Sequence, residues 1–99
     1  METFKDIING EQPVLVDFFA TWCGPCKAMT PVIESVGKEL QGQARVLKID
    51  IDKNPAIANK FQIQSVPTLI IFKKGEVLWR NTGGMDKSSL IEQVKNFAD

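Results

Sequence analysis

The two cysteines of the chain, Cys23 and Cys26, lie together in the segment FFATWCGPCKAMTP, with Gly24 and Pro25 between them. A structural disulfide would close so short a loop that it would remove little chain entropy. Structural zinc usually needs four Cys or His ligands, and the chain has no histidine, so a zinc site within one chain is disfavoured. Two inert core cysteines are a third interpretation, because free cysteine is often buried. Reversible thiol–disulfide exchange is the fourth, and the local sequence favours it.

The expected position of the pair favours redox chemistry. An apolar run ends at Ala20 and helical spacing starts near Cys23, so the cysteines lie at a strand-to-helix junction. Unpaired N–H groups and the positive dipole end of a helix stabilise a thiolate, which is the reactive form of cysteine. We therefore expect Cys23 to attack and Cys26, closer to the core, to resolve. Gly24 lets the turn form, and Pro25 needs no N–H bond in the first helical turn.

The elements that position this junction follow from the apolar pattern. PVLVDFFA (13–20) and ARVLKIDI (44–51) read as strands, and PTLIIFKKGEVLWRNTGG (67–84) as two antiparallel strands around a turn. Helical spacing and capping signals, which include Asn54 before Pro55, predict helices near 4–8, 23–40, 55–61 and 86–97. The order α-β-α-β-α-β-β-α, in one domain spanning residues 1–99, predicts an α/β sandwich with a right-handed parallel βαβ unit. Chemistry in such sheets gathers beyond the carboxyl ends of parallel strands, where the cysteines lie.

The hexapeptide WCGPCK, with VDFFA before it and SVPTLIIFKKGE after it, resembles thioredoxin, and the resemblance extends from about Phe4 to the C-terminus. It implies a thioredoxin-like three-layer α/β/α sandwich around a mixed sheet. It also implies a redox-active Cys23–Cys26 disulfide and the reduction of protein disulfides by dithiol–disulfide exchange. The implied partners are disulfide-containing proteins and a flavin-containing thioredoxin reductase that supplies electrons from NADPH. The resemblance further implies a monomer with no bound cofactor or metal.

Three further residues each have two interpretations. Asp17 is either an exposed carboxylate or, in a strand covered on both faces, a buried acid with a raised pKa that accepts a proton. Thioredoxins carry a buried Asp at this position, beneath the resolving cysteine. Lys48 is either a solvent-facing strand lysine or the family's lysine that neighbours and tunes that Asp. Pro67 is acceptable as an ordinary strand-start proline, but the family has a cis proline here that shapes the site, so we expect a cis Val66–Pro67 bond.

The resemblance also implies an apolar docking surface for target proteins. In the family, the backbone of the residue before the cis proline pairs with an extended target peptide, which tolerates varied sequences. The matching positions of this chain are Trp22, Gly24, Pro25, Ile51, Ile63, Val66, Gly83 and Gly84. The alternatives are a core aromatic at Trp22 and an ordinary turn at Gly83–Gly84. The place of Trp22 before the reactive turn favours docking.

Two features depart from the family pattern. Thioredoxins usually begin with a short strand, whereas this chain starts directly with the helix expected from Phe4. We therefore expect a four-stranded sheet with strand 44–51 at an edge, where unpaired backbone groups invite aggregation unless they are protected. Phe19 replaces a tryptophan that is common in the family. Neither change affects the sulfur chemistry.

Composition and charge exclude other classes of protein. Twelve Lys and Arg balance twelve Asp and Glu, and the longest like-charge run is Lys73–Lys74, so binding to nucleic acid or anionic membranes is not expected. No apolar run approaches the ~18 residues that a membrane helix needs. The start METFKDIING lacks the basic and apolar regions of a signal peptide, which predicts a cytoplasmic location.

Other functions remain as alternatives to a disulfide reductant. A thiol oxidase or isomerase uses the same sulfur chemistry, although Gly24–Pro25 resembles the dipeptide of reductants. A thioredoxin-fold binding module would act independently of its thiols. Two chains that each contribute a cysteine pair could bind a metal or cluster. Asp50 and Asp52 could suggest a metal pair, but polar residues at a strand end are the simpler interpretation.

Overall fold

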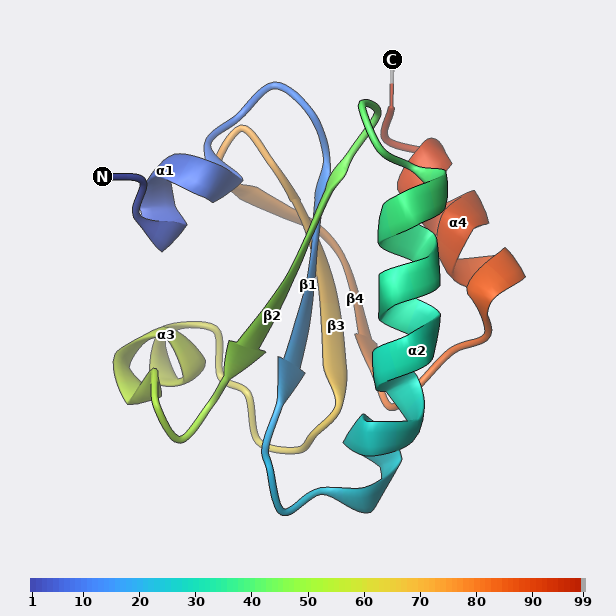
Figure 1. Cartoon of the computed structure of the whole chain (residues 1–99). Helices are drawn as coiled ribbons and strands as arrows, with labels where there is room; N and C mark the ends of the chain where they lie inside the picture. The colour runs from blue at the N-terminus through green and yellow to red at the C-terminus, as the bar shows by residue number, and fades with distance from the viewer. Residues whose placement is uncertain (99) are drawn as a thin grey trace.

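The computed structural model of the chain describes residues 1–98. Its elements follow in the predicted order, α-β-α-β-α-β-β-α (Figure 1). They are α1 (Phe4–Ile8), β1 (Val14–Phe19), α2 (Gly24–Glu39), β2 (Arg45–Asp50), α3 (Pro55–Lys60), β3 (Thr68–Lys73), β4 (Glu76–Thr82) and α4 (Lys87–Lys95). The predicted α/β fold class is confirmed.

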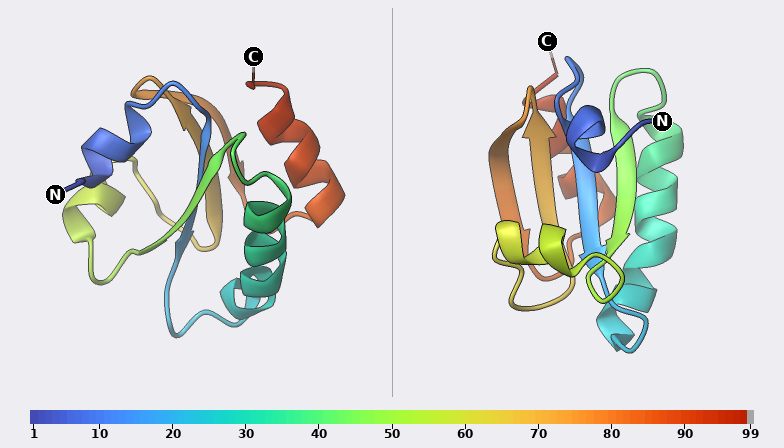
Figure 2. Two further views of the ribbon diagram at one scale, coloured as in Figure 1. Left: turned by 45° about the horizontal axis from the view of Figure 1, so that its top comes forward. Right: turned by 90° about the vertical axis from the view of Figure 1, so that its left-hand side faces the viewer.

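The strands form one mixed sheet of four, in the order β2-β1-β3-β4 (Figure 2). β1 and β2 are parallel and are joined through α2, whereas β1 pairs with β3, and β3 with β4, in antiparallel fashion. β2 is therefore an edge strand, as predicted. It carries three charged side chains, Arg45, Lys48 and Asp50, and Arg45 forms an ion pair with Glu2 at 2.7 Å. Charged side chains on an edge strand oppose pairing with another chain.

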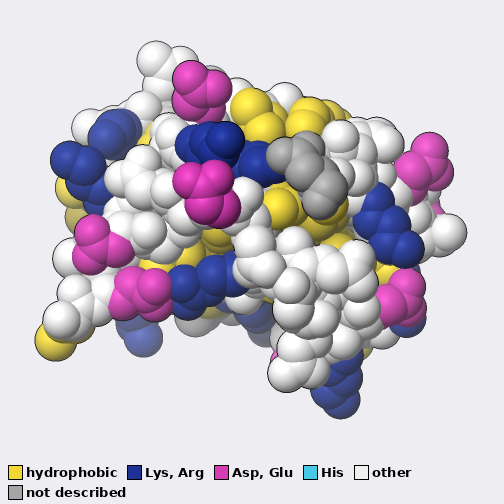
Figure 3. Space-filling view, turned by 90° about the horizontal axis from the view of Figure 1, so that it is seen from above, with side chains coloured by type: hydrophobic (Ala, Val, Ile, Leu, Met, Phe, Trp, Pro, Cys, Tyr) yellow, Lys and Arg dark blue, Asp and Glu magenta, His cyan; other side chains and the backbone are white. Residues whose placement is uncertain are grey.

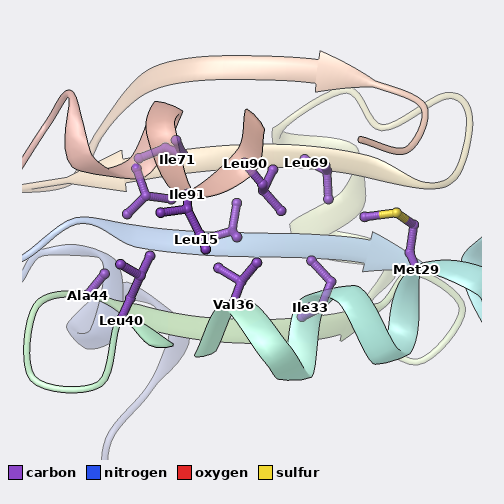
Figure 4. Close-up of a cluster of buried hydrophobic side chains, with 11 residues drawn as sticks. Leu15, Met29, Ile33, Val36, Leu40, Ala44, Leu69, Ile71, Leu90 and Ile91 are labelled. Carbon is purple, nitrogen blue, oxygen red and sulfur yellow. The ribbon is translucent and has the colours of Figure 1, made fainter. Parts of the chain in front are cut away.

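Helices cover both faces of the sheet and produce the three layers. α2 and α4 lie on one face, and α1 and α3 on the other (Figure 1). The core beneath α2 and α4 is made of interdigitating aliphatic side chains, among them Leu15, Ile33, Val36, Leu69 and Leu90 (Figure 4). On the other face, the rings of Phe4, Phe61 and Phe72 pack edge to face, with centroids between 5.0 and 6.1 Å apart. Burial of each such side chain contributes roughly 1.5–3 kcal/mol to stability.

The alternation of side chains along β1 and β2 decides which layer each residue faces. Leu15 packs into the core beneath α2, whereas Val16 packs on the side of α1 and α3. Asp17 lies two residues after Leu15 on the strand, so its side chain points to the same face, towards α2. On β2, Val46 packs against the same core, so Lys48 also projects to the α2 side. Since Asp17 and Lys48 are register partners in the parallel pair, their side chains are neighbours on one face.

The carboxyl ends of β1 and β2 lie at one end of the molecule, where the segment 20–23 leads into α2 (Figure 1). The opposite end carries both termini, and acidic and basic side chains are interspersed over it (Figure 3). Within residues 1–98, no helix has the length and apolar character needed to cross a membrane.

The helix caps agree with the sequence at α4 and differ at α3. The Asp86 carboxylate accepts a hydrogen bond from the Ser89 N–H at 3.1 Å, as expected of a cap. Asn54 was expected to cap α3, but its side chain makes no cap hydrogen bond. Its amide instead donates to the Asp50 carbonyl at 3.0 Å and closes the turn after β2. Asn54 therefore occupies the N-cap position, as predicted, but the expected cap hydrogen bond is absent because the side chain is oriented towards Asp50.

Candidate active site

Cys23 and Cys26 are joined by a disulfide at the N-terminus of α2, with 5.3 Å between their Cα atoms. Cys23 is the N-cap residue, and its Sγ accepts a hydrogen bond from the Cys26 N–H at 3.1 Å. Pro25 lies in the first turn, where a missing N–H has no cost. The Cys23 sulfur therefore lies at the positive end of the helix, where the amide and the dipole stabilise a thiolate.

Both cysteines are largely shielded from solvent, at 5% exposure for Cys23 and 2% for Cys26. They pack with Ala20, and the partly buried side chains of Ile51 and Val66 lie against them. The shielding of the sulfurs fits a site that is approached through contact with a partner rather than from open water.

The loop before β3 reaches the cysteine pair. The Val66–Pro67 peptide bond is cis, as the resemblance implies. The Val66 carbonyl oxygen lies 3.7 Å from the Sγ of Cys23. The Gly83 N–H donates to the Pro67 carbonyl at 2.8 Å and ties the segment after β4 to this loop. Segments far apart in the sequence thus meet beside one sulfur.

Asp17 is completely buried on β1, and neither of its carboxylate oxygens has a hydrogen-bonding partner among the described residues. Burial raises the pKa of Asp17 from the usual 3.8 to about 6, although the positive charge of Lys48 acts in the opposite direction. An acid with a pKa near neutrality can both accept and return a proton under physiological conditions. The buried position was the one expected from the sequence.

Lys48 does not pair directly with that carboxylate. Its exposed side chain donates from Nζ to the Thr30 hydroxyl at 2.7 Å, and the ammonium lies 4.5 Å from the centroid of the Phe19 ring. Sequence reasoning did not identify Thr30. The available signal was a polar residue four positions after Cys26, one turn along the helix that carries the cysteines.

Of the residues expected to form the docking surface, Ile51 and Val66 lie against the cysteines. Trp22 is 69% exposed, and its indole N–H donates to the Asp52 carboxylate at 2.9 Å. Gly24, Pro25 and Gly84 are exposed, and Ile51, Ile63, Val66 and Gly83 are half-buried. Ile51 and Ile63 together line a shallow pocket of about 430 Å³ on the α3 side. The exposure of Trp22 excludes the alternative of a core position for that residue.

The acidic pair after β2 has structural partners. The Asp50 carboxylate accepts hydrogen bonds from the N–H groups of Asp52, at 2.9 Å, and Lys53, at 3.3 Å. Asp52 in turn accepts from Trp22. Within the described part of the chain, no three His, Cys, Asp or Glu side chains form a group that could hold a metal ion. Both aspartates serve the turn that leads into α3.

The site combines a Cys-x-x-Cys disulfide that caps a helix beyond a parallel strand with a cis proline and a buried acid. These features define a thiol–disulfide oxidoreductase. Residues 1–96 match the family model Thioredoxin, and the chain belongs to the thioredoxin family.

Individual relatives agree with this assignment. A thioredoxin-like protein of Synechocystis sp. is 50% identical over 95 residues, which cover 95% of this chain and 90% of that protein. A bifunctional thioredoxin reductase/thioredoxin of Mycobacterium leprae is 43% identical over 93 residues, or 94% of this chain and 20% of that protein. The solved structure of a mutant thioredoxin from Halobacterium salinarum has a TM-score of 0.87 at 36% identity, covering 96% of this chain and 82% of the other. The chain is accordingly a disulfide reductant that works by dithiol–disulfide exchange through Cys23 and Cys26.

Proposed function

We propose that the chain is a general reductant of protein disulfides in the cytoplasm, recharged with electrons from NADPH by a flavin-containing thioredoxin reductase. The observation that carries the proposal is the Cys23 sulfur, which caps α2 and accepts the Cys26 N–H. Support for the reductase comes from the Mycobacterium leprae relative, whose name joins both activities in one protein. Support for the cytoplasm comes from the chemistry, because a dithiol donor is kept reduced only in a reducing compartment.

The first step is attack by the Cys23 thiolate on one sulfur of a target disulfide. A bond forms between Cys23 and that sulfur, the target disulfide breaks, and the second target sulfur leaves as a thiolate. The N–H of Cys26 and the positive end of α2 favour the thiolate form of Cys23 before the attack. The product is a mixed disulfide between the chain and its target.

The second step releases the target. Cys26 gives its proton to the Asp17 carboxylate, and the Cys26 thiolate attacks the sulfur of Cys23. The Cys23–Cys26 disulfide forms, the mixed disulfide breaks, and the first target sulfur leaves as a thiolate. Two electrons have then passed from the dithiol of the chain to the target. Asp17 suits the task because its pKa of about 6 lies near the working pH, and because its oxygens have no other partner among residues 1–98.

Docking of the target uses the surface around the disulfide. We assign main-chain pairing with an extended target segment to Val66, whose carbonyl lies beside Cys23. The exposed Trp22 and the half-buried Ile51, which lies against the cysteines, provide apolar area. Since main-chain pairing and apolar contact demand little of the target sequence, this arrangement supports a broad range of protein substrates, each bound by a monomer of the chain.

The test is the reduction of insulin disulfides by the chain together with NADPH and a thioredoxin reductase. The wild-type chain should consume NADPH in proportion to the disulfides reduced. A variant with Cys23→Ser and Cys26→Ser should be folded and inactive. Retention of the cellular function by that double variant would instead support a binding module that does not use its thiols.

A further inference from the structure

A small pocket opens beside the resolving cysteine, on the α2 side of the sheet. It has a volume of about 240 Å³, and its walls include Phe19, Cys26, Lys27, Thr30 and Lys48. β1, β2 and the first turns of α2 supply these residues, so the pocket lies on the face of the sheet towards which Asp17 points. Lys48, which lines this pocket together with Cys26, is also the charge that acts on Asp17.

The ammonium of Lys48 is fixed there by two contacts. Its Nζ donates to the Thr30 Oγ1 at 2.7 Å, and it lies over the Phe19 ring at 4.5 Å from the centroid. An exposed lysine otherwise samples many rotamers, because its side chain carries ~2 kcal/mol of rotamer entropy. The cation–π contact limits the distance from the ring but not the direction of the ammonium. The directional contact is the hydrogen bond to Thr30.

Thr30 is itself oriented by the helix that carries the active site. Its hydroxyl donates to the carbonyl oxygen of Cys26, one turn earlier, at 3.4 Å. This bond uses the single proton of the hydroxyl and leaves its lone pairs free to accept from Lys48. The lysine, the threonine and the backbone of the resolving cysteine therefore form one chain of hydrogen bonds.

The position of Lys48 matters because Asp17 is its register partner on β1, on the same face of the sheet. Few other charges face Asp17. β3 places the apolar Leu69 opposite it, and α2 contributes Cys26, with Lys27 at the pocket wall. Burial raises the pKa of Asp17, and the Lys48 charge lowers it. The strength of the second effect depends on where the ammonium is held.

We propose that Thr30 is a positioning residue for the release step, holding the Lys48 ammonium where its charge acts on the Asp17 carboxylate. The proposal rests on the proposed role of Asp17 as proton acceptor from Cys26. Thr30 touches neither the target nor the reacting sulfurs. It acts through Lys48, and its effect is a shift in the pH at which release becomes fast.

The test compares Thr30→Val, which removes the hydroxyl and keeps the branched shape, with Thr30→Ser, which keeps the hydroxyl. Two curves are measured against pH: the rate of release in single-turnover reduction of a mixed disulfide, and the 13C shift of the Asp17 carboxyl in the reduced protein. A nearby opposite charge lowers an acid pKa by ~1–3 units. Because Thr30→Val loosens the Lys48 ammonium, both midpoints should shift upward by ~0.5 pH unit in this variant. Thr30→Ser should restore the wild-type midpoints.

A double-mutant cycle separates this role from a structural one. Lys48→Met should shift both midpoints upward, and Thr30→Val should add no further shift in that background. The proposal is overturned if the Thr30→Val midpoints match wild type, or if they shift equally with and without Lys48. If the pH midpoints of Thr30→Val match wild type while Asp17→Asn releases the target slowly, only the role of Thr30 is overturned. Release at the wild-type rate in Asp17→Asn overturns the proton acceptor as well, and this proposal with it.

Discussion

The Sγ of Cys23 accepts a hydrogen bond from the backbone N–H of Cys26 at 3.1 Å, so one reactive cysteine caps the helix that contains the other. The two sulfurs are consequently not equivalent. Cys23 gains the amide and the positive end of α2, which favour its thiolate. Cys26 is slightly more buried, and it lies on α2, the helix that Asp17 faces.

This asymmetry predicts which single variant traps targets. Cys26→Ser should accumulate stable mixed disulfides on Cys23 in a cell lysate, because the resolving sulfur is absent. Cys23→Ser should trap few or none. Non-reducing gels followed by dithiothreitol treatment measure the captured proteins. Capture by Cys23→Ser with none by Cys26→Ser would reverse the two roles.

Burial of Asp17 predicts how stability depends on pH. The folded pKa of about 6 lies above the usual 3.8, so the folded state holds the proton more tightly than the unfolded state. Asp17 does not reduce the free energy of unfolding below pH ~4. As the pH rises towards about 6, ionising the buried acid lowers the free energy of unfolding, and the full loss remains at higher pH. At ~1.4 kcal/mol per pKa unit, the loss is at most about 3 kcal/mol.

Asp17→Asn should therefore unfold at higher denaturant than wild type at pH 7, by at most about 3 kcal/mol, and the advantage should vanish near pH 4. The amide stands in for the protonated acid and carries no charge. Urea unfolding at several pH values is the measurement. A constant difference across the pH range, or a less stable variant throughout, would show that Asp17 is well solvated or well paired.

The same substitution should slow release of the target. Without a carboxylate, Cys26 loses its proton acceptor, and general-base assistance typically contributes ~10²–10⁴-fold to a rate. The initial attack by Cys23 should change much less, because the Cys26 N–H and the positive end of α2, rather than Asp17, favour the Cys23 thiolate. Stopped-flow single-turnover reduction separates the two phases. An unchanged second phase would remove Asp17 from the mechanism.

Trp22 offers a test of docking with little effect on the fold. Its side chain is 69% exposed, so Trp22→Ala should alter the free energy of unfolding by no more than ~0.5 kcal/mol. It should raise the KM for a protein disulfide several-fold, because an apolar anchor is removed. Val77→Ala is the matched control, since Val77 is 46% exposed on β4, away from the cysteines. Equal KM values in both variants would exclude Trp22 from the docking surface.

Local pattern was sufficient to predict the elements and the burial of Asp17. The apolar run 13–20 has no polar face, so a strand covered on both sides was required, and any acid within it had to be buried. Within residues 1–98 no strand precedes α1, and β2 lies at the sheet edge, as the pattern predicted.

The contacts that tune the site could not be predicted in the same way. The hydrogen bonds from Lys48 to Thr30 and from Trp22 to Asp52 join residues 18 and 30 positions apart, and they depend on how α2 and the loop after β2 lie against β1. Asn54 is the N-cap residue of α3, as predicted, but it makes no cap hydrogen bond for a related reason, because its amide donates to the Asp50 carbonyl instead. Propensity indicates what a side chain can do, and packing selects among those options.

The chain donates electrons rather than withdrawing them, and the equilibrium redox potential of the Cys23–Cys26 pair tests this direction of transfer most directly. The chain is equilibrated in graded ratios of reduced to oxidised dithiothreitol, and the two thiol states are separated after alkylation. We predict a potential of about −270 mV, the value characteristic of thioredoxins as a class. A potential of about −180 mV or higher, as found in disulfide isomerases and oxidases, would contradict the assignment as a reductant.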